Sequence, residues 1–371
     1  MRNLTIIFSS LIFTFFTCDY FYSQKKKNFN ANVFSKNCIK NSIKLGYEYF
    51  PNQKCRYKRV VKNHLEYDNV FFTNNFGFVS GFDYQIQNKD KVKRAVVLGY
   101  SKTEGNYLKT NWPTKASNDS EGKFEFYNFA RAGYFNLNLY NIYFDLVRNF
   151  SFDYIFLPIV GKTDDQFMIF EKRKDGIYDG LFKNQPRSEE DFNSNFFSKM
   201  SLMYTFFNSY DSSSLSSNFD IFTRNYIIFK KNFNKLLGKN TSLRSLDDHQ
   251  SNLFPGQEHH KFYKFLGKRN VEIFLAIISD ALNKGAKVVF YQGLIKGKLP
   301  SKSRKDSTYH FYKWLKKKYP NKFLYFDGNE TSINISKSDY KDLFFKYDGH
   351  WNQKGSDLFA RGILNFLKQN K

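Results

Sequence analysis

Short apolar runs, rich in β-branched and aromatic residues, alternate along this chain with stretches of helical periodicity. The apolar runs lie at 94–100, 124–130, 154–160, 287–291 and 322–326, and the helical stretches include 134–150, 271–284, 306–318 and 354–368. Apolar runs of this length with these flanks are typical of buried strands. Strands separated by helices form successive βα units, which build a parallel sheet with helices on both faces. We therefore predict an α/β fold, a three-layer α/β/α sandwich around a mostly parallel five-stranded sheet.

Two regions interrupt this alternation. Residues 25–68 are polar and basic with little periodicity, and we interpret them as a basic lead-in arm. Residues 69–371 then form the main domain, in which residues 171–265 are long, Phe- and Ser-rich and only patchily helical. We expect this segment to be an insertion that caps the carboxyl edge of the sheet, where ligands bind in folds of this kind.

The N-terminus has the pattern of a targeting segment. Residues 4–22 are almost wholly apolar, Arg2 precedes them and Lys25 follows them. The apolar centre has the length of a signal-peptide core and is shorter than the roughly 20 residues of a spanning helix. We expect residues 1–24 to be a signal peptide or a membrane anchor, and the rest of the chain to be extracytoplasmic. A buried N-terminal helix is the alternative.

Cysteines are few in this chain. It has 3 Cys, and removal of the first segment leaves Cys38 and Cys55. An even number of cysteines is what a single disulfide outside the cytoplasm requires. Spacing alone does not decide between this disulfide and two free thiols, so both alternatives stay open.

The net charge of +24, from 58 Lys+Arg against 34 Asp+Glu, raises the question of a nucleic-acid partner. The lysines are scattered, however, and no RNP, zinc-finger or helix-turn-helix signature accompanies them. The abundance of Phe, Lys, Asn, Tyr and Ile is also what AT-rich codons supply. We expect no dedicated nucleic-acid surface. A general preference for acidic partners, such as anionic glycans or lipid head groups, is compatible with the charge.

A serine follows the first predicted strand. The strand runs into Gly99, and Ser101 lies between that glycine and Gly105. A serine on a tight turn at the carboxyl edge of a sheet exposes its hydroxyl, and nearby backbone N–H groups can converge on an anion. Ser101 is therefore a candidate nucleophile. The alternative is a serine that only forms the turn or caps a helix.

Near the other end of the chain, Asp348 and His350 lie two positions apart on a glycine-containing loop, directly before the helix predicted at 354–368. This spacing can bring the carboxylate onto one imidazole nitrogen while the other nitrogen faces the edge of the sheet. Such a pair supplies the base of a nucleophile triad and the group that orients it. The alternative is an Asp that caps the helix beside a surface His.

Taken in order, these segments resemble the blocks of the SGNH/GDSL hydrolase family. The resemblance covers roughly residues 69–371 and rests on NFGF at 75–78, VVLGYSKTEG at 96–105, YNFARAGY at 127–134, LPIVGKTDD at 157–165 and DGHWNQKG at 348–355. It implies an SGNH-hydrolase-like fold with a catalytic triad of Ser101, His350 and Asp348. It also implies an oxyanion hole formed by the N–H groups of Ser101 and Gly133 together with Thr163.

The sequence departs from the family pattern at two places. Tyr100 stands where the family usually has Asp, and Thr163 stands where it has the Asn of the oxyanion hole. A Thr hydroxyl is shorter than an Asn amide, and loss of one such donor costs ~10²–10³ in kcat. A slow enzyme, a donor shifted to Lys162 and an inactive relative are all compatible with this change. The Asp-x-His spacing resembles that of family members that move acetyl groups onto or off polysaccharides.

With its candidate triad, the resemblance implies a serine-dependent hydrolase of O-acyl esters, in particular a carbohydrate acetyl esterase. An O-acyltransferase that modifies an extracytoplasmic glycan is the alternative within the same chemistry. A catalytically inactive module that binds a glycan or organises an assembly is the alternative from another class. The implied mechanism needs no metal or cofactor, and the His-containing clusters at 247–249 and 258–260 lack the spacing of metal ligands.

Overall fold

The computed structural model describes the chain in several stretches. These are residues 31–35, 38–42, 44–61, 64–88, 92–158, 166–172, 178–184, 254, 258–297, 307–332 and 334–370. The expected leader at 1–24 lies outside them, as do Thr163 and the greater part of the expected insertion at 171–265. No helix within the described stretches is long and apolar enough to cross a membrane.

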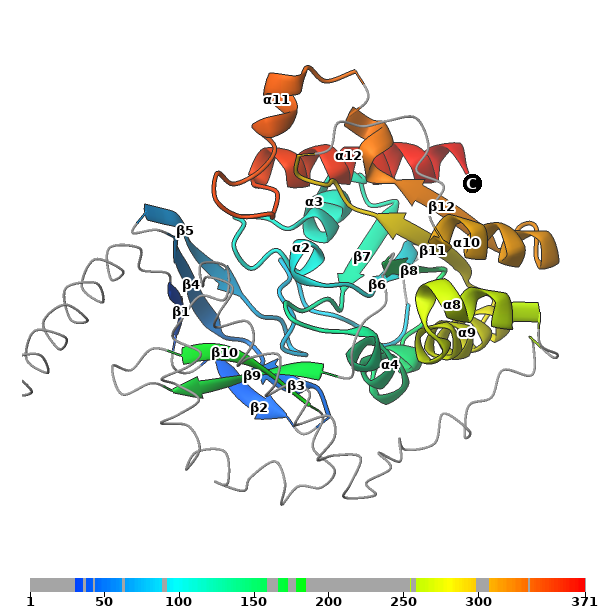
Figure 1. Ribbon diagram of the computed structural model, residues 1–371, viewed down its shortest axis with the longest axis horizontal. Coiled ribbons are helices and arrows are strands. Elements are labelled where there is room, and N and C mark those ends of the chain that lie inside the picture. Colours follow the sequence, from blue (N-terminus) through cyan, green and yellow to red (C-terminus); the bar gives the residue numbers. More distant parts are fainter. Residues whose placement is uncertain are drawn as a thin grey trace, which may run out of the picture. The chain divides into compact units, whose positions relative to one another are not determined.

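A five-stranded parallel sheet forms the core of the described part (Figure 1). Its strands are β6 (Lys93–Val97), β7 (Phe124–Asn128), β8 (Tyr154–Pro158), β11 (Lys287–Gln292) and β12 (Phe323–Asp327). They lie in the order β12-β11-β8-β6-β7, and every neighbouring pair is parallel. The alternation of apolar runs and helical stretches therefore predicted the strands and their parallel arrangement correctly.

Helices cover both faces of this sheet (Figure 1). On one face, α3 (Trp112–Asp119) packs against the terminal helix α12 (Gln353–Gln369). The other face carries α4 (Asn136–Asp145), α9 (Lys268–Asn283) and α10 (Ser307–Lys318). The chain passes from β6 to β7 in one direction along the sheet, and from β8 through β11 to β12 in the opposite direction. Because all crossovers share the same right-handed sense, a reversal of direction places the connecting helices on the opposite face. The predicted three-layer sandwich is confirmed.

Shorter helices join these elements. They are α2 (Ser101–Glu104), η1 (Val147–Asn149), η3 (Glu258–Phe262), α8 (Tyr263–Leu266), η4 (Gly328–Ser332) and α11 (Lys337–Lys341). The helix expected over 134–150 is divided into α4 and η1, because Leu146 between them leaves the helical region with φ −134°. Gly285 follows α9 with φ 83°, the left-handed conformation that ends many helices.

The expected lead-in arm at 25–68 is instead largely folded into strands. These are β1 (Ala31–Phe34), β2 (Ile39–Ser42), β3 (Gly46–Tyr49), β4 (Lys54–Val61) and β5 (His64–Phe72). They form one antiparallel sheet in the order β1-β4-β5 and one β2-β3 pair. Along β4, Cys55 and Tyr57 are buried while Lys54 and Arg56 are exposed. Lys54 and Arg56 thus occupy outward positions of the strand, and their charge obscured the period of two that identifies it.

A further hairpin begins the region expected to be an insertion. Its strands are β9 (Gln166–Lys172) and β10 (Tyr178–Asn184), which pair in antiparallel fashion. The predicted start of the insertion, at about residue 171, falls inside β9. Both strands pack against the N-terminal strands, β9 against β3 and β10 against β1.

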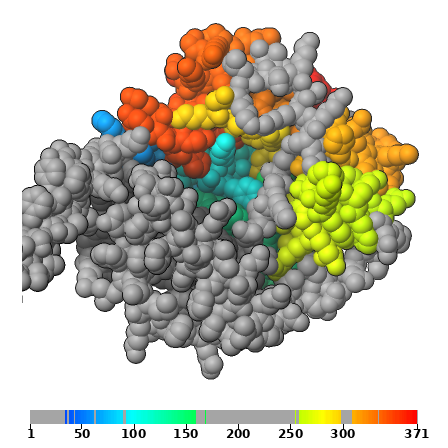
Figure 2. Space-filling model, viewed as in Figure 1, coloured from blue at the N-terminus to red at the C-terminus, as the bar shows by residue number. Residues whose placement is uncertain are grey.

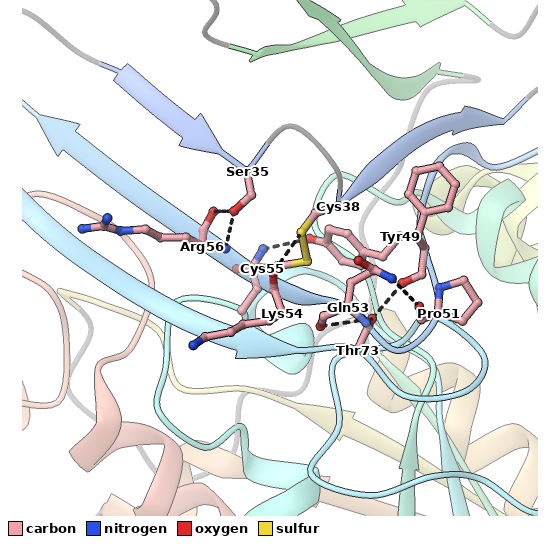
Figure 3. Close-up of a disulfide and its surroundings, with 11 residues drawn as sticks. Ser35, Cys38, Tyr49, Pro51, Gln53, Lys54, Cys55, Arg56 and Thr73 are labelled. Atoms are coloured by element: carbon pink, nitrogen blue, oxygen red, sulfur yellow. Dashed lines mark hydrogen bonds between the residues drawn. A yellow bond between two sulfur atoms is a disulfide. The ribbon is translucent and has the colours of Figure 1, made fainter.

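Cys38 and Cys55 form a disulfide, with their Cα atoms 5.7 Å apart (Figure 3). The bridge connects the segment before β2 to β4, and both cysteines are almost fully buried. Next to it, the Arg56 N–H donates to the Ser35 hydroxyl at 2.7 Å. Of the two alternatives that the spacing left open, the structure has the disulfide.

Replacement of both Cys38 and Cys55 by Ser should destabilise the protein. The bridge closes a loop with a sequence separation of 17, and a loop of that size corresponds to about 3 kcal/mol of stabilisation. Thermal denaturation of the wild type and the double variant, each with and without a reductant, measures the effect. We expect the reductant to lower the wild-type midpoint toward that of the variant and to leave the variant unchanged. Equal midpoints for all four samples would contradict a stabilising bridge.

Candidate active site

Ser101 begins α2 at the carboxyl end of β6, where the direction of the connections changes. β6 lies between β7 and β8, and the chain leaves β6 toward one side of the sheet and β8 toward the other. In open α/β sheets such a switch point is where ligands bind. Figure 2 shows the cyan surface of the region around residue 100 beside the orange surface of the segment that precedes α12.

A close approach at Gly99 determines the shape of the turn before Ser101. A Cβ atom at this glycine would lie 2.5 Å from the Tyr291 hydroxyl and 2.7 Å from Thr103 Oγ1. The Tyr291 hydroxyl itself donates to the Leu98 carbonyl at 2.8 Å and lies 2.8 Å from Thr103 Oγ1. β11 therefore braces the turn, and only glycine leaves room for it.

The loop between α11 and α12 carries His350 and is held on both sides. The Phe345 N–H donates to the His350 carbonyl at 3.1 Å, and the Asn352 N–H donates to the Leu343 carbonyl at 2.8 Å. Trp351 is 1 % exposed, and its ring centroid lies 5.0 Å from that of Phe359 in α12. The buried tryptophan thus fixes the position of the histidine that precedes it.

The structure brings Ser101, His350 and Asp348 into one hydrogen-bonded chain. His350 Nε2 lies 2.6 Å from Ser101 Oγ across a separation of 249 positions, and His350 Nδ1 lies 2.7 Å from Asp348 Oδ1. With the proton on Nδ1 donated to the carboxylate, Nε2 is free to accept the serine proton. The Tyr107 ring packs against the imidazole, with 4.9 Å between the centroids. The arrangement can deprotonate a serine hydroxyl.

Two further side chains, which the sequence did not indicate, contact the Asp348 carboxylate. Its Oδ2 atom lies 3.4 Å from Arg59 Nε and 3.5 Å from the Tyr67 hydroxyl. Burial raises the pKa of the Asp348 carboxyl, but the hydrogen bond and charge of His350, together with the charge of Arg59, outweigh it and hold that pKa at about 2. The carboxylate is therefore ionised at neutral pH.

Lys296 is a third contact that was not anticipated. Its ammonium donates to the carbonyl oxygens of Phe345, Lys346 and Asp348 at 2.6, 2.8 and 2.8 Å. One cation thus ties together the backbone of the loop that presents Asp348. Because carbonyl groups accept these bonds and their partner comes from the segment after β11, no local motif announces the contact.

Gly133 lies on the loop that follows β7, in the left-handed conformation with φ 71°. The neighbouring Ala132 N–H donates to Glu104 Oε2 in α2 at 2.9 Å, which ties this loop to the helix that Ser101 begins. Burial raises the pKa of the Glu104 carboxyl to about 7. Met168 of β9 covers Gly133, since a Cβ atom at the glycine would lie 2.5 Å from Met168 Cε.

The groups expected to form an oxyanion hole are only partly described. Within the described stretches, the N–H groups of Ser101 and Gly133 have no hydrogen-bond acceptor. Thr163 and Lys162 lie outside those stretches, so the structure does not place them. The same stretches contain no cluster of His, Cys, Asp or Glu that could hold a metal ion, and residues 247–249 lie outside them.

No protein-family model matches this sequence, and no curated protein matches it. Among solved structures, the chain is similar to a protein of the G-D-S-L family from Desulfitobacterium hafniense DCB-2, with a TM-score of 0.33 and 10% identity over 74% of this chain and 99% of that one. It is similar to a protein from Bacteroides fragilis NCTC 9343 assigned as an acylhydrolase, with a TM-score of 0.34 and 14% identity over 77% of this chain and 92% of that one. A salicylyl-acyltransferase from a tetracycline biosynthetic pathway has a TM-score of 0.34 and 11% identity over 81% of this chain and 58% of that one.

The Asp348→Asn variant tests the charge state of this carboxyl. Because the pKa of Asp348 in the folded protein is about 2, the ionised group stabilises the fold above its unfolded-state pKa of ~4, and this contribution is lost as the pH falls through ~2. We expect the stability gap between wild type and variant to be larger at pH 6 than at pH 2 by roughly 2 kcal/mol. Chemical denaturation at both pH values measures the gap, and an equal gap at the two values would contradict this charge state.

Proposed function

We propose that the protein is a serine-dependent hydrolase of O-acyl esters, with Ser101 as nucleophile, His350 as base and Asp348 as the group that orients the base. The observation that carries the proposal is the continuous chain of contacts, 2.6 Å from Ser101 Oγ to His350 Nε2 and 2.7 Å from His350 Nδ1 to Asp348 Oδ1. Ser101 lies 249 positions before His350 and on another element, and the three residues meet in the order that nucleophilic catalysis requires.

In each step of the reaction, His350 accepts or donates the proton that is transferred. Ser101 Oγ attacks the ester carbonyl while His350 Nε2 takes its proton, and Asp348 stabilises the imidazolium that forms. The tetrahedral intermediate then releases the alcohol, which takes the proton from His350 and leaves an acyl-serine. A water molecule, deprotonated by His350, attacks the acyl group and releases the acid and the free serine.

The N–H groups of Ser101 and Gly133 are the donors that we assign to the oxyanion, with Thr163 as a third. Backbone donors of this kind stabilise charge that develops only in the transition state. The link from Glu104 to Ala132 supports the assignment of Gly133, because it attaches the glycine loop to the helix that carries the nucleophile.

We further propose carbohydrate acetyl esters as the substrate class and an extracytoplasmic compartment as the location. The Asp-x-His spacing at 348–350 supports the substrate, through its resemblance to members that act on acetylated polysaccharides. The Cys38–Cys55 disulfide supports the location, because disulfides persist in oxidising compartments. Residues 4–22 would serve as the export signal or the membrane anchor.

A fluorophosphonate tests the reactive serine without knowledge of the substrate. We expect intact-mass analysis of the labelled full chain to show one adduct, which Ser101→Ala abolishes and His350→Ala reduces at least ~10³-fold in rate. Ser338→Ala, a change of an exposed serine, is the matched control and should label like the wild type. Absence of an adduct on the folded wild type would overturn the enzyme proposal and favour an inactive binding module.

The fate of the acyl group distinguishes the two reactions that an acyl-serine allows. With an acetylated sugar as donor, release of acetate that needs Ser101 supports the hydrolase. Acetyl transfer to an added sugar acceptor at the expense of acetate would identify an O-acyltransferase instead, and would replace the hydrolase in the proposal.

The Gly133→Ala variant tests the oxyanion assignment. The added Cβ would collide with Met168 and displace the loop, so we expect the rate of fluorophosphonate labelling to fall by ~10²–10³-fold. Gly122→Ala is the control, because Gly122 has φ 76° and nothing within 4 Å of the added atom. It incurs the same backbone strain without the collision, and it should label at the wild-type rate. Equal labelling rates for the two variants would contradict the assignment of Gly133 to the oxyanion hole.

A further inference from the structure

We propose that the β4–β5 hairpin belongs to the catalytic apparatus, with Arg59 and Tyr67 acting as positioning residues that hold Oδ2 of Asp348. The inference rests on the proposed function, because it assigns these two residues to the reaction that Ser101 and His350 carry out. It concerns a part of the chain that precedes the first strand of the parallel sheet.

The two residues face each other across the hairpin. Arg59 in β4 pairs with Tyr67 in β5, and the register shifts directly after Arg59. Residues that are paired across antiparallel strands project from the same face, and an irregularity at that point changes the direction in which the side chains point. The pairing therefore explains why both reach the same oxygen of Asp348, at 3.4 Å from Arg59 Nε and 3.5 Å from the Tyr67 hydroxyl.

The two oxygens of Asp348 have separate partners. Oδ1 contacts the His350 ring at 2.7 Å, and Oδ2 contacts only the hairpin among the described residues. The Asp348 side chain is 7% exposed, so little water is available to satisfy the second oxygen. A buried carboxylate with one unsatisfied oxygen costs free energy of folding. Without a partner on that oxygen, the carboxylate could also rotate toward other donors. The hairpin contact therefore holds the carboxylate in the orientation that His350 needs.

A layer of tyrosines supports the hairpin contact. The Tyr67 hydroxyl lies 3.2 Å from the Tyr57 hydroxyl, and Tyr57 also hydrogen-bonds Arg59. Tyr67 and Tyr57 are both buried. The Arg59 side chain is 31% exposed, which leaves the guanidinium partly hydrated while it serves the carboxylate. Two buried tyrosines thus support the contact with Asp348, and the partly exposed Arg59 supplies its positive charge.

The charge of Arg59 has a second effect on the reaction. A cation beside Asp348 favours its ionised form, but it also opposes the positive charge that His350 acquires when it takes the serine proton. The other titratable or charged groups that face this pair are Tyr57, Tyr67, Tyr107, Lys102 in α2 and Lys296 after β11. Removal of Arg59 therefore takes away one charge that acts on both Asp348 and the imidazolium formed in the reaction.

The pH dependence of fluorophosphonate labelling in the full chain tests the inference. For Arg59→Met, we expect the maximal labelling rate to fall about tenfold. We also expect the acidic limb of the rate profile to move to higher pH by about half a unit, since the neutral imidazole is required. Arg59→Lys keeps the charge and should restore the limb to the wild-type position. Tyr67→Phe removes one hydroxyl and should lower the rate less, with little effect on folding.

Arg56→Met is the matched control on the same strand. Arg56 forms an ion pair with Asp68 across the same hairpin, with 2.6 Å between Nη2 and Oδ2, and its side chain is 62% exposed. We expect this variant to keep the wild-type rate and pH profile. Circular dichroism on all variants confirms that they are folded.

The outcomes separate the failure of this inference from the failure of the proposed function. A wild type that is not labelled at Ser101 overturns the proposed function. A labelled wild type whose Arg59→Met and Tyr67→Phe variants behave like Arg56→Met overturns the inference and leaves the function intact. A slower Arg59→Met with an unmoved acidic limb, and without recovery in Arg59→Lys, shows a purely structural role and also overturns it.

Discussion

The contact between the Ser101 hydroxyl and the His350 imidazole is the interaction on which the rest of the site depends. Both residues are placed by buried neighbours and have little freedom of their own. Tyr291 of β11 occupies the space over Gly99 before the serine, and Trp351 after the histidine packs over Gly293, with 2.8 Å between an added Cβ and its ring. A hydrogen bond tolerates only a few tenths of an ångström of displacement, so these two glycines are as necessary to the geometry as Ser101 and His350 themselves.

Around that contact, the structure resolves a conflict between burial and charge. A carboxylate that orients the imidazole has to be dry enough to interact strongly and still remain ionised. Arg59 and Tyr67 on one side and the His350 ring on the other meet both needs for Asp348. Arg131 is a second buried charge, and among the described residues it is stabilised by aromatic rings and has no direct carboxylate partner. It is 2% exposed, and its guanidinium lies over the rings of Phe78 and Tyr49 at 4.6 and 4.9 Å.

The sequence indicated the parallel sheet and the three residues that meet at Ser101, because both have local signals. Apolar runs of strand length identify β6 and β8, and a serine after a strand or an Asp-x-His loop before a helix is visible within ten residues. Arg59, Tyr67 and Lys296 have no such signal, since each meets Asp348 or its loop only through the tertiary fold. The N-terminal strands were missed for a different reason. Lysine and arginine on the exposed face of β4 obscured the alternation of buried residues, and aromatic residues such as Tyr57 were counted as part of an irregular arm.

The contacts between β5 and the loop before α12 join an N-terminal hairpin to a loop near the C-terminal helix. The Tyr347 N–H donates to Glu66 Oε1 at 2.8 Å across a separation of 281 positions, and the His64 and Tyr347 rings stack with 5.5 Å between their centroids. During synthesis, the hairpin emerges from the ribosome long before the loop that it contacts. The hairpin therefore lacks its contacts with the loop at Tyr347 until nearly the whole chain has been synthesised. Contacts of such long range also form slowly. A nascent or prematurely terminated chain therefore has Ser101 without His350 beside it, and the contact between them forms only when the last segment docks.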